Sequence, residues 1–230
     1  MGLIIFKETN VQFPQRTHFV FNLVSETLMY KLYNFPYSQH SRRVVSLLEQ
    51  VGIDYDSHVV DMMNGEHMSS DYLAVNPNHQ IPTLIDGDVK IHESHAIMRY
   101  LCVKHALVAW YPRTGDAFAK VEQWLDWIQC QLSQLVVDIV LNSVFLGEHG
   151  DKEAVDKAKN VIPAKFKILE NQLATTAYLT GDKPTIADLS LASIMFHLNF
   201  ANAMPKTPNI SRWYENMAAL PGFQKSLPET

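Results

Sequence analysis

The sequence has few cysteines, no excess of basic residues and no long uninterrupted apolar run. Its two cysteines, Cys102 and Cys130, show neither CxxC nor Cys/His spacing, which argues against a disulfide framework and against a zinc site. Basic residues number 19 against 24 acidic ones, so binding to a nucleic-acid backbone is not indicated. The richest apolar stretch, residues 135–146, is interrupted by Asp138 and Asn142 and is shorter than the ~20 residues that span a bilayer. We therefore expect a soluble protein of a reducing, cytoplasmic compartment, without metal, membrane or nucleic acid as partners.

The chain is long enough, at 230 residues with 47% hydrophobic content, for one large or two small domains with real cores. Residues 1–28 show no sustained period and no long apolar run before a cleavage site, so we interpret them as an N-terminal extension and not as a signal peptide. A strand within residues 3–6 or residues 18–24 is the alternative. Regular patterns begin at Met29.

Residues 29–105 alternate strand and helix patterns in the order βαβαββα, which predicts an α/β domain. Asp86-Gly87-Asp88 separates the last two strands and is typical of a tight hairpin turn. The expected strands are residues 30–33, 55–60, 81–85 and 89–91, and the expected helices run from Ser38 or Gln39 to Gly52, over 65–74 and over 93–104.

Residues 106–115 are expected to be a linker, and residues 116–230 to form an all-helical domain. Apolar residues recur at three- and four-residue steps from Val121 to Ile139, which predicts one long amphipathic helix. Further helices are expected at about 151–174, 185–201, 208–219 and 221–227.

The segment from Tyr33 to Arg43 combines a strand end, a loop and a helix start, where an anion is stabilised. A helix N-terminus carries unpaired N–H groups and about half a positive charge, so it favours a thiolate over a thiol. Ser38 is the hydroxyl best placed to donate to such a sulfur. Ser38 is also suited to cap the helix without touching a ligand.

Two further segments have the residue types that bind a peptide-like ligand. A cis bond before Pro82 would expose the backbone of Ile81 for pairing with an extended ligand, whereas a trans proline would only mark a strand edge. Glu93 and Ser94 fall in the first turn of a helix, where they can bind the amino and carboxylate groups of an α-amino acid or serve only as caps.

In this order, the segments resemble the motifs of the glutathione transferases, and the resemblance covers nearly all of the chain after Met29. Ser38-Gln39-His40-Ser41-Arg42 is similar to the serine motif of the theta and delta classes, with His40 where proline is common. Residues 76–84 and 93–97 resemble the cis-proline segment and the glutamate-serine signature. Thr185-Ile186-Ala187-Asp188 resembles the family's capping box. The chain is identified as a theta/delta-like, serine-type cytosolic member of the bacterial type.

The resemblance implies a thioredoxin-like α/β N-terminal domain at residues 29–105 and an all-α C-terminal helical bundle, which together make the cytosolic glutathione transferase fold. It also implies that Ser38 donates to the sulfur of glutathione. Ile81, beside Pro82 in the cis form, would pair with the cysteinyl backbone. Glu93 and Ser94 would hold the γ-glutamyl end.

The remaining site residues follow from the same resemblance. His67, His79 and Gln80 are expected near the glycyl carboxylate, and His95 in the glutathione site. Met68 and Gln80 stand where some relatives carry lysine, which weakens charge pairing there. The electrophile pocket is expected to contain Phe35, Tyr37, Trp127 and Gln131.

The implied function is detoxification by a homodimeric transferase, with glutathione as co-substrate and no metal. The thiol would be activated for attack on a small hydrophobic electrophile or a peroxide. Tyr30, Tyr33 and Tyr37 leave a tyrosine-dependent mechanism to be considered, whereas the loop lacks the cysteine of cysteine-dependent relatives. A non-catalytic ligand-binding or interaction protein of the same fold, and a glutathione-dependent dehalogenase, are the alternatives.

Overall fold

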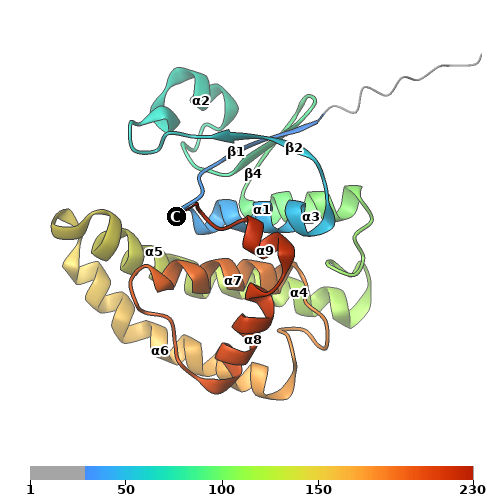
Figure 1. Cartoon of the computed structure of the whole chain (residues 1–230), viewed down its shortest axis with the longest axis vertical. Helices are drawn as coiled ribbons and strands as arrows, with labels where there is room; N and C mark the ends of the chain where they lie inside the picture. The colour runs from blue at the N-terminus through green and yellow to red at the C-terminus, as the bar shows by residue number, and fades with distance from the viewer. Residues whose placement is uncertain (1–28, 230) are drawn as a thin grey trace, which may run out of the picture.

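The computed structural model describes residues 29–229. The strands considered at residues 3–6 and 18–24 lie outside the described residues. Figure 1 shows a small sheet with helices on both faces in one half of the molecule, and a set of helices in the other half. This is the thioredoxin-like domain followed by a helical domain that the resemblance implies.

The sheet has four strands in the order β2-β1-β3-β4. β1 pairs in parallel with β2, as the βαβ pattern predicted, and β3 pairs antiparallel with β4, as the hairpin turn predicted. β3 also pairs antiparallel with β1. Leu32 lies opposite Leu84 in this register, and neither side chain is exposed, so the centre of the sheet is also part of the core. The strands are Tyr30–Asn34 (β1), Tyr55–Val59 (β2), Thr83–Asp86 (β3) and Val89–His92 (β4).

Three helices surround the sheet: α1 (Gln39–Val51), α2 (Ser70–Val75) and α3 (Ser94–Lys104). α1 and α3 contact each other below the sheet, and α2 lies above it (Figure 1). Ser38 caps the start of α1, and Gly52 ends it with a φ of 69°, a left-handed conformation that glycine adopts without a Cβ penalty. The short irregular helix expected at 65–74 is a 3₁₀ turn, Glu66–Met68 (η1), followed by α2.

The helical half consists of α4 (Gly115–Trp127), α5 (Gln134–Val140), α6 (Lys152–Thr175), α7 (Ile186–Asn199), α8 (Pro208–Ala218) and α9 (Pro221–Lys225). The long helix predicted from the apolar period is present as one continuous helical run, but its hydrogen-bond pattern changes to π-helical at two places. A π-helical turn, Ile128–Ser133 (η2), separates α4 from α5, and a second one, Leu141–Phe145 (η3), follows α5. Such turns change which side chains face a neighbour, and they are frequent at functional sites.

Gly115–Phe145 form one helical run of 31 residues that passes a test for a membrane span by length and composition alone. The sequence predicted a long amphipathic helix over this segment, although no uninterrupted apolar stretch in it reaches the length of a membrane span. The core helix of a globular domain passes the same test. Here α6 and α7 both pack against the run, and part of it is buried inside the molecule.

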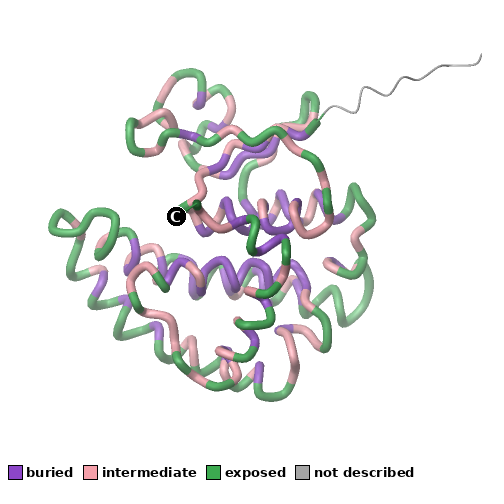
Figure 2. Tube along the Cα trace, viewed as in Figure 1, coloured by how far each residue is buried: buried purple, intermediate pink, exposed green. Residues whose placement is uncertain are grey.

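The centre of the molecule is α7, which Figure 2 shows as buried along nearly its whole length. Its first turn has the capping box that the sequence indicated, between Thr185 and Asp188. α1 packs against both α7 and α9, so one apolar core continues from the sheet into the helical half. This continuity fixes the end of β1 and the start of α1 against the helical half.

Candidate active site

A cavity of about 720 Å³ lies between the α/β half and the run from α4 to η3. One wall is the loop between β1 and α1, and the opposite wall is the helical run. The floor is formed by the segments that precede β3 and α3. Most of the residues predicted from the sequence line this cavity, namely Phe35, Tyr37, Ser38, His67, His79, Gln80, Ile81, Pro82, Glu93 and Ser94.

Three predicted site residues do not line the cavity. His95 points into the helical half, where its Nε2 atom lies 2.7 Å from the Ser190 hydroxyl, and burial lowers the pKa of its imidazole well below the ordinary value. Trp127 packs edge-to-face against Trp124 at 5.3 Å. Gln131 is exposed and accepts a hydrogen bond from Lys165 at 2.8 Å.

The helical run has a stripe of cavity-facing residues that explains why Trp127 and Gln131 lie outside. The stripe has a four-residue spacing and consists of Gln129, Ser133, Val137, Leu141 and Phe145. Residues four apart share a helix face, whereas residues two apart do not. Trp127 and Gln131 are two residues away from members of the stripe. The four-residue spacing was the sequence signal that could have found the correct face.

Ser38 lies on the cavity wall, at the N-terminus of α1. Its Oγ accepts a hydrogen bond from the backbone N–H of Ser41 at 3.3 Å, so it does cap the helix. The loop before it is held by two further bonds, from Phe35 N to Ser41 Oγ at 3.1 Å and from the Arg42 guanidinium to Pro36 O at 3.0 Å. Capping uses an oxygen lone pair and leaves the hydroxyl hydrogen available. The two roles weighed for Ser38 are therefore compatible.

Ile81 and Pro82 form the middle of the floor, and the peptide bond between them is cis. The carbonyl of Gln80 accepts bonds from Tyr72 Oη at 2.6 Å and from Asn76 Nδ2 at 2.8 Å, which fixes the turn. Among residues 29–229, the Ile81 backbone has no partner in the turn and loop hydrogen bonds. Its N–H and C=O are available to an extended ligand.

Glu93 and Ser94 occupy the start of α3, where free backbone N–H groups point out of the helix. Glu93 is exposed and has a φ of 69°, which is uncommon for a residue with a side chain and is often found at binding sites. Ser94 is buried, and its Oγ accepts a hydrogen bond from Arg43 at 3.1 Å. This corner can hold an amino group and a carboxylate together.

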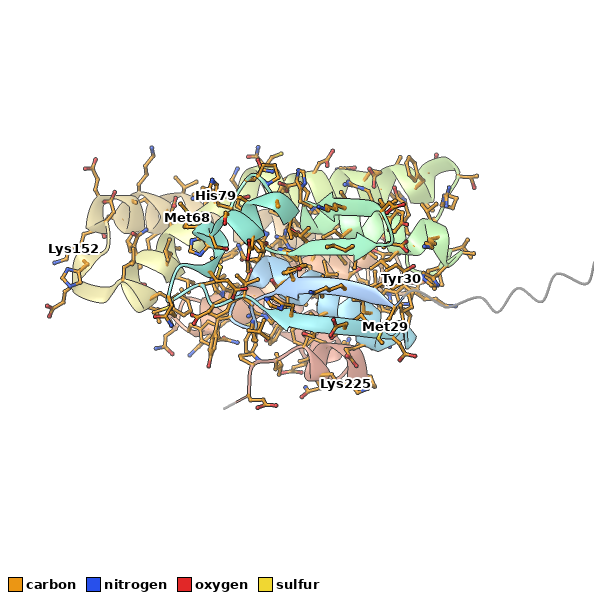
Figure 3. All side chains as sticks on the ribbon, turned by 90° about the horizontal axis from the view of Figure 1, so that it is seen from above. Met29, Tyr30, Met68, His79, Lys152 and Lys225 are labelled. Carbon is orange, nitrogen blue, oxygen red and sulfur yellow. The ribbon has the colours of Figure 1, made fainter. Side chains whose placement is uncertain are left out.

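His67 and His79 lie at another end of the cavity, on η1 and in the loop after α2. The Nδ1 atom of each is buried without a hydrogen-bond partner among the described residues. Met68, next to His67, is exposed, and Figure 3 shows Met68 and His79 at the end of the α/β half opposite to Met29. An imidazole N–H can donate to a carboxylate, so two histidines at this end of the cavity suit an anion.

Aromatic side chains gather at the end of the cavity nearest the helical half. Tyr37 lies 6.3 Å from Phe145 between ring centroids, and Phe145 stacks on His197 at 6.1 Å. Burial lowers the pKa of His197 to about 3, so its ring is neutral. With Val137 and Leu141, these groups make an apolar wall that suits an uncharged molecule.

Arg43 and His40 were not proposed as site residues from the sequence, although both lie next to the cavity. Arg43 is buried and donates to Nδ1 of His40 at 3.0 Å. Burial, together with the charge of Arg43, lowers the pKa of His40 well below its usual value. Their position in the serine motif was visible in the sequence, but their contacts depend on α3 and η2, which come from distant parts of the chain.

A thioredoxin-like domain with a cis-proline turn and an amino-acid subsite, joined to a helical domain that supplies an apolar wall, defines the cytosolic glutathione transferase fold. Residues 28–102 match the family described as glutathione S-transferase, N-terminal domain, and residues 132–221 match glutathione S-transferase, C-terminal domain. The chain belongs to the glutathione S-transferase family and is a glutathione transferase by homology.

Similar proteins extend over most of the chain. Glutathione S-transferase 3 of Zea mays is 34% identical over 207 residues, which cover 86% of this chain and 92% of the relative. The structure of glutathione S-transferase III in its apo form is 34% identical with a TM-score of 0.76, covering 88% of this chain and 99% of that chain. A theta-class enzyme from Xanthomonas axonopodis pv. citri, solved with glutathione bound, is 25% identical with a TM-score of 0.79, covering 87% and 98%.

Proposed function

We propose that the protein is a serine-type transferase in which Ser38 activates the thiol of glutathione. The observation that carries this proposal is the place of Ser38 at the N-terminus of α1, on the cavity wall and with its hydroxyl hydrogen not used for capping. The hydroxyl and the helix N-terminus both stabilise a thiolate. The thiol proton leaves to water, the sulfur bonds to the electrophilic carbon, and the leaving group departs with its electron pair.

The tripeptide is proposed to lie across the floor of the cavity. Glu93 accepts from its α-ammonium group, and Ser94 binds its α-carboxylate at the start of α3. The backbone of Ile81, beside Pro82, pairs with the cysteinyl residue as a short added strand. His67 and His79, with Gln80, are within the same cavity for the glycyl carboxylate.

The electrophile is proposed to be small and hydrophobic, since the wall nearest to Ser38 is apolar. Phe35 and Tyr37 form it on the loop side, and the stripe from Val137 to Phe145 forms it on the helical side. A wall of this kind favours uncharged molecules, because its side chains carry no charge that could pair with an ion.

Serine fits this geometry better than the strand tyrosines. The hydroxyl of Tyr30 lies 2.8 Å from Nε2 of His105, away from the cavity. Tyr33 packs against the rings of His58 and Tyr72. Tyr37 does line the cavity, but its ring belongs to the apolar wall.

The finer expectations from the resemblance are retained in this proposal. They are a homodimer in the cytoplasm, a theta/delta-like class, and a division into residues 29–105, a linker at 106–115 and residues 116–230. Sedimentation of the purified protein tests the dimer directly.

The test of the serine mechanism is the ultraviolet difference spectrum of bound glutathione across pH. In the wild type we expect a thiolate band that titrates below the pKa of ~8.5 of a free thiol. Ser38→Ala should raise the pKa of the bound thiol by about one unit, and lower kcat/KM by about 10² as a donor to the anion is lost. Tyr37→Phe is the control and should keep the wild-type titration. If glutathione binds to the wild type while its thiol titrates as in water, the catalytic assignment fails and a carrier role replaces it.

A further inference from the structure

Arg43 is a buried cation without a counter-ion. The side chain has no exposed surface, and no carboxylate of residues 29–229 lies within ion-pair distance of its guanidinium. Burial lowers the pKa of Arg43 to about 9, so the group is still charged at neutral pH. A buried charge that nothing balances is costly, and proteins rarely keep one without a use.

The hydrogen bonds of Arg43 all lead to neutral groups around the cavity. Its Nη1 atom lies 2.9 Å from Gln129 Oε1, 3.0 Å from His40 Nδ1 and 3.1 Å from Ser94 Oγ. These three residues all line the cavity, and they come from η2, α1 and α3. The guanidinium therefore sits directly behind the wall, with a single layer of polar side chains between its charge and the space where a ligand lies.

The bond to Ser94 also orients that hydroxyl. An arginine can only donate, so Ser94 Oγ must accept, and the hydrogen of the hydroxyl must point away from Arg43. Ser94 is the first residue of α3, where the backbone N–H groups of the first turn have no partner within the helix, and it lines the cavity. The cation strengthens Ser94 as a donor in that direction, since a charged partner polarises the bond.

We propose that Arg43 is a positioning residue for the γ-glutamyl end of glutathione: it orients the Ser94 hydroxyl and supplies the positive charge that the α-carboxylate balances. This inference rests on the proposed function, in which Ser94 binds that carboxylate. Glu93 is the acid whose charge acts most on Arg43, and it is exposed and assigned to the ammonium group. The α-carboxylate of the ligand therefore adds to the negative charge of Glu93, which acts on Arg43 without forming an ion pair with it.

The test compares two ligands by calorimetric titration: glutathione, and γ-aminobutyryl-cysteinylglycine, which lacks only the α-carboxylate. In the wild type, glutathione should bind at least about tenfold more tightly, as expected for a charge-assisted bond of ~1.5 kcal/mol or more. Arg43→Gln should weaken glutathione by a similar factor and leave the affinity for the analogue unchanged. Arg99→Gln is the matched control, because Arg99 pairs with Glu122 and Asp126 outside the cavity.

A purely structural role for Arg43 predicts a different pattern, in which both ligands lose affinity by the same factor and the preference for the carboxylate is retained. That outcome overturns the inference and leaves the proposed function intact, which the thiol titration of Ser38→Ala tests separately. If Arg43→Gln does not fold, nitrogen-15 spectra of the wild-type arginine side chains answer the question. The Arg43 resonances should shift with glutathione and stay in place with the analogue, and equal shifts with both ligands contradict the proposal.

Discussion

In the proposed mechanism, Ser38 serves both the helix and the ligand. Its Oγ accepts a hydrogen bond from the backbone N–H of Ser41 in the first turn of α1. Its hydroxyl hydrogen is then available to donate to the sulfur of glutathione. Both uses depend on the same unpaired N–H groups, because the cap places the hydroxyl where the positive end of the helix is strongest. An alanine at this position therefore weakens the helix start as well as the thiolate, and the Tyr37→Phe control does neither.

Asp188 is a buried acid that holds three segments of the helical half together. Its buried carboxylate accepts from Leu179 N, Thr185 N and Trp213 Nε1, each at 2.9 Å, and from Thr185 Oγ1 at 3.1 Å. Asp188→Ala leaves these donors buried and unpaired, so we expect it to lower the free energy of unfolding by about 3–5 kcal/mol. Urea denaturation measures the effect.

Asp182→Ala provides the control for Asp188, since Asp182 lies a few residues away and is exposed. Its urea midpoint should stay within error of the wild type. Equal midpoints for Asp182→Ala and Asp188→Ala would contradict the role assigned to the buried carboxylate.

At the scale of elements, α9 is seated directly on α1. A Cβ at Gly222 would lie 2.3 Å from the backbone nitrogen of Gln50, and the Gly222 N–H donates to Gln50 Oε1 at 2.9 Å. Gly222→Ala must push α9 away, and we expect a loss of about 1–3 kcal/mol in thermal or urea unfolding. Gln224→Ala, on the exposed side of α9, should cost less. A Gly222→Ala variant with wild-type stability would show that α9 can shift without loss.

The order of the elements was predictable because local patterns determine it. The βαβ unit, the hairpin at Asp86-Gly87-Asp88 and the helix from Ser38 to Gly52 depend on turn residues, caps and alternation within a few positions. The π-helical turns were not predictable, because they change the direction of side chains without changing the apolar period. The cavity-facing side of that run was nevertheless visible in its four-residue spacing, which Trp127 and Gln131 do not share.

Contacts between the α/β half and the helical half were the part of the site that the sequence predicted least well. His95 was expected beside glutathione, but its partner Ser190 lies 95 residues further along the chain. The guanidinium of Arg43 meets Gln129 across a similar distance in sequence. A motif shows which residues are near in the chain, whereas the direction in which each side chain points is decided by packing between domains. The motifs therefore located the floor of the cavity and not the residues behind it.

For the whole molecule, the buried imidazoles of His95 and His197 and the partly buried imidazole of His40 make stability depend on pH. Burial lowers the pKa of His40, His95 and His197, so all three stay neutral in the folded chain. The unfolded chain takes up protons as the pH falls below 6.5, and the folded chain does not until about pH 3 at His197. The free energy of unfolding should therefore fall steadily from pH 6.5 downward.

His197→Phe should make this loss smaller, because it removes one of the groups that protonates only on unfolding. The measurement is the urea midpoint at pH 8 and at pH 5 for the wild type and the variant. His149→Gln is the control, since His149 is exposed. A wild-type difference between the two pH values that persists unchanged in His197→Phe argues against a contribution from this imidazole.

The floor and the apolar wall of the cavity come from different parts of the chain, so each can change in evolution without the other. The floor that is proposed to bind the tripeptide comes from residues 62–94, whereas the stripe from Val137 to Phe145 belongs to a helical run with one face turned to the cavity. We expect substitutions along that stripe to change which electrophiles fit the cavity and to leave the affinity for the tripeptide unchanged. We expect variants from libraries confined to these positions to bind a glutathione resin even when their electrophilic substrate has changed. Natural variants can likewise change their electrophilic substrate while they retain glutathione.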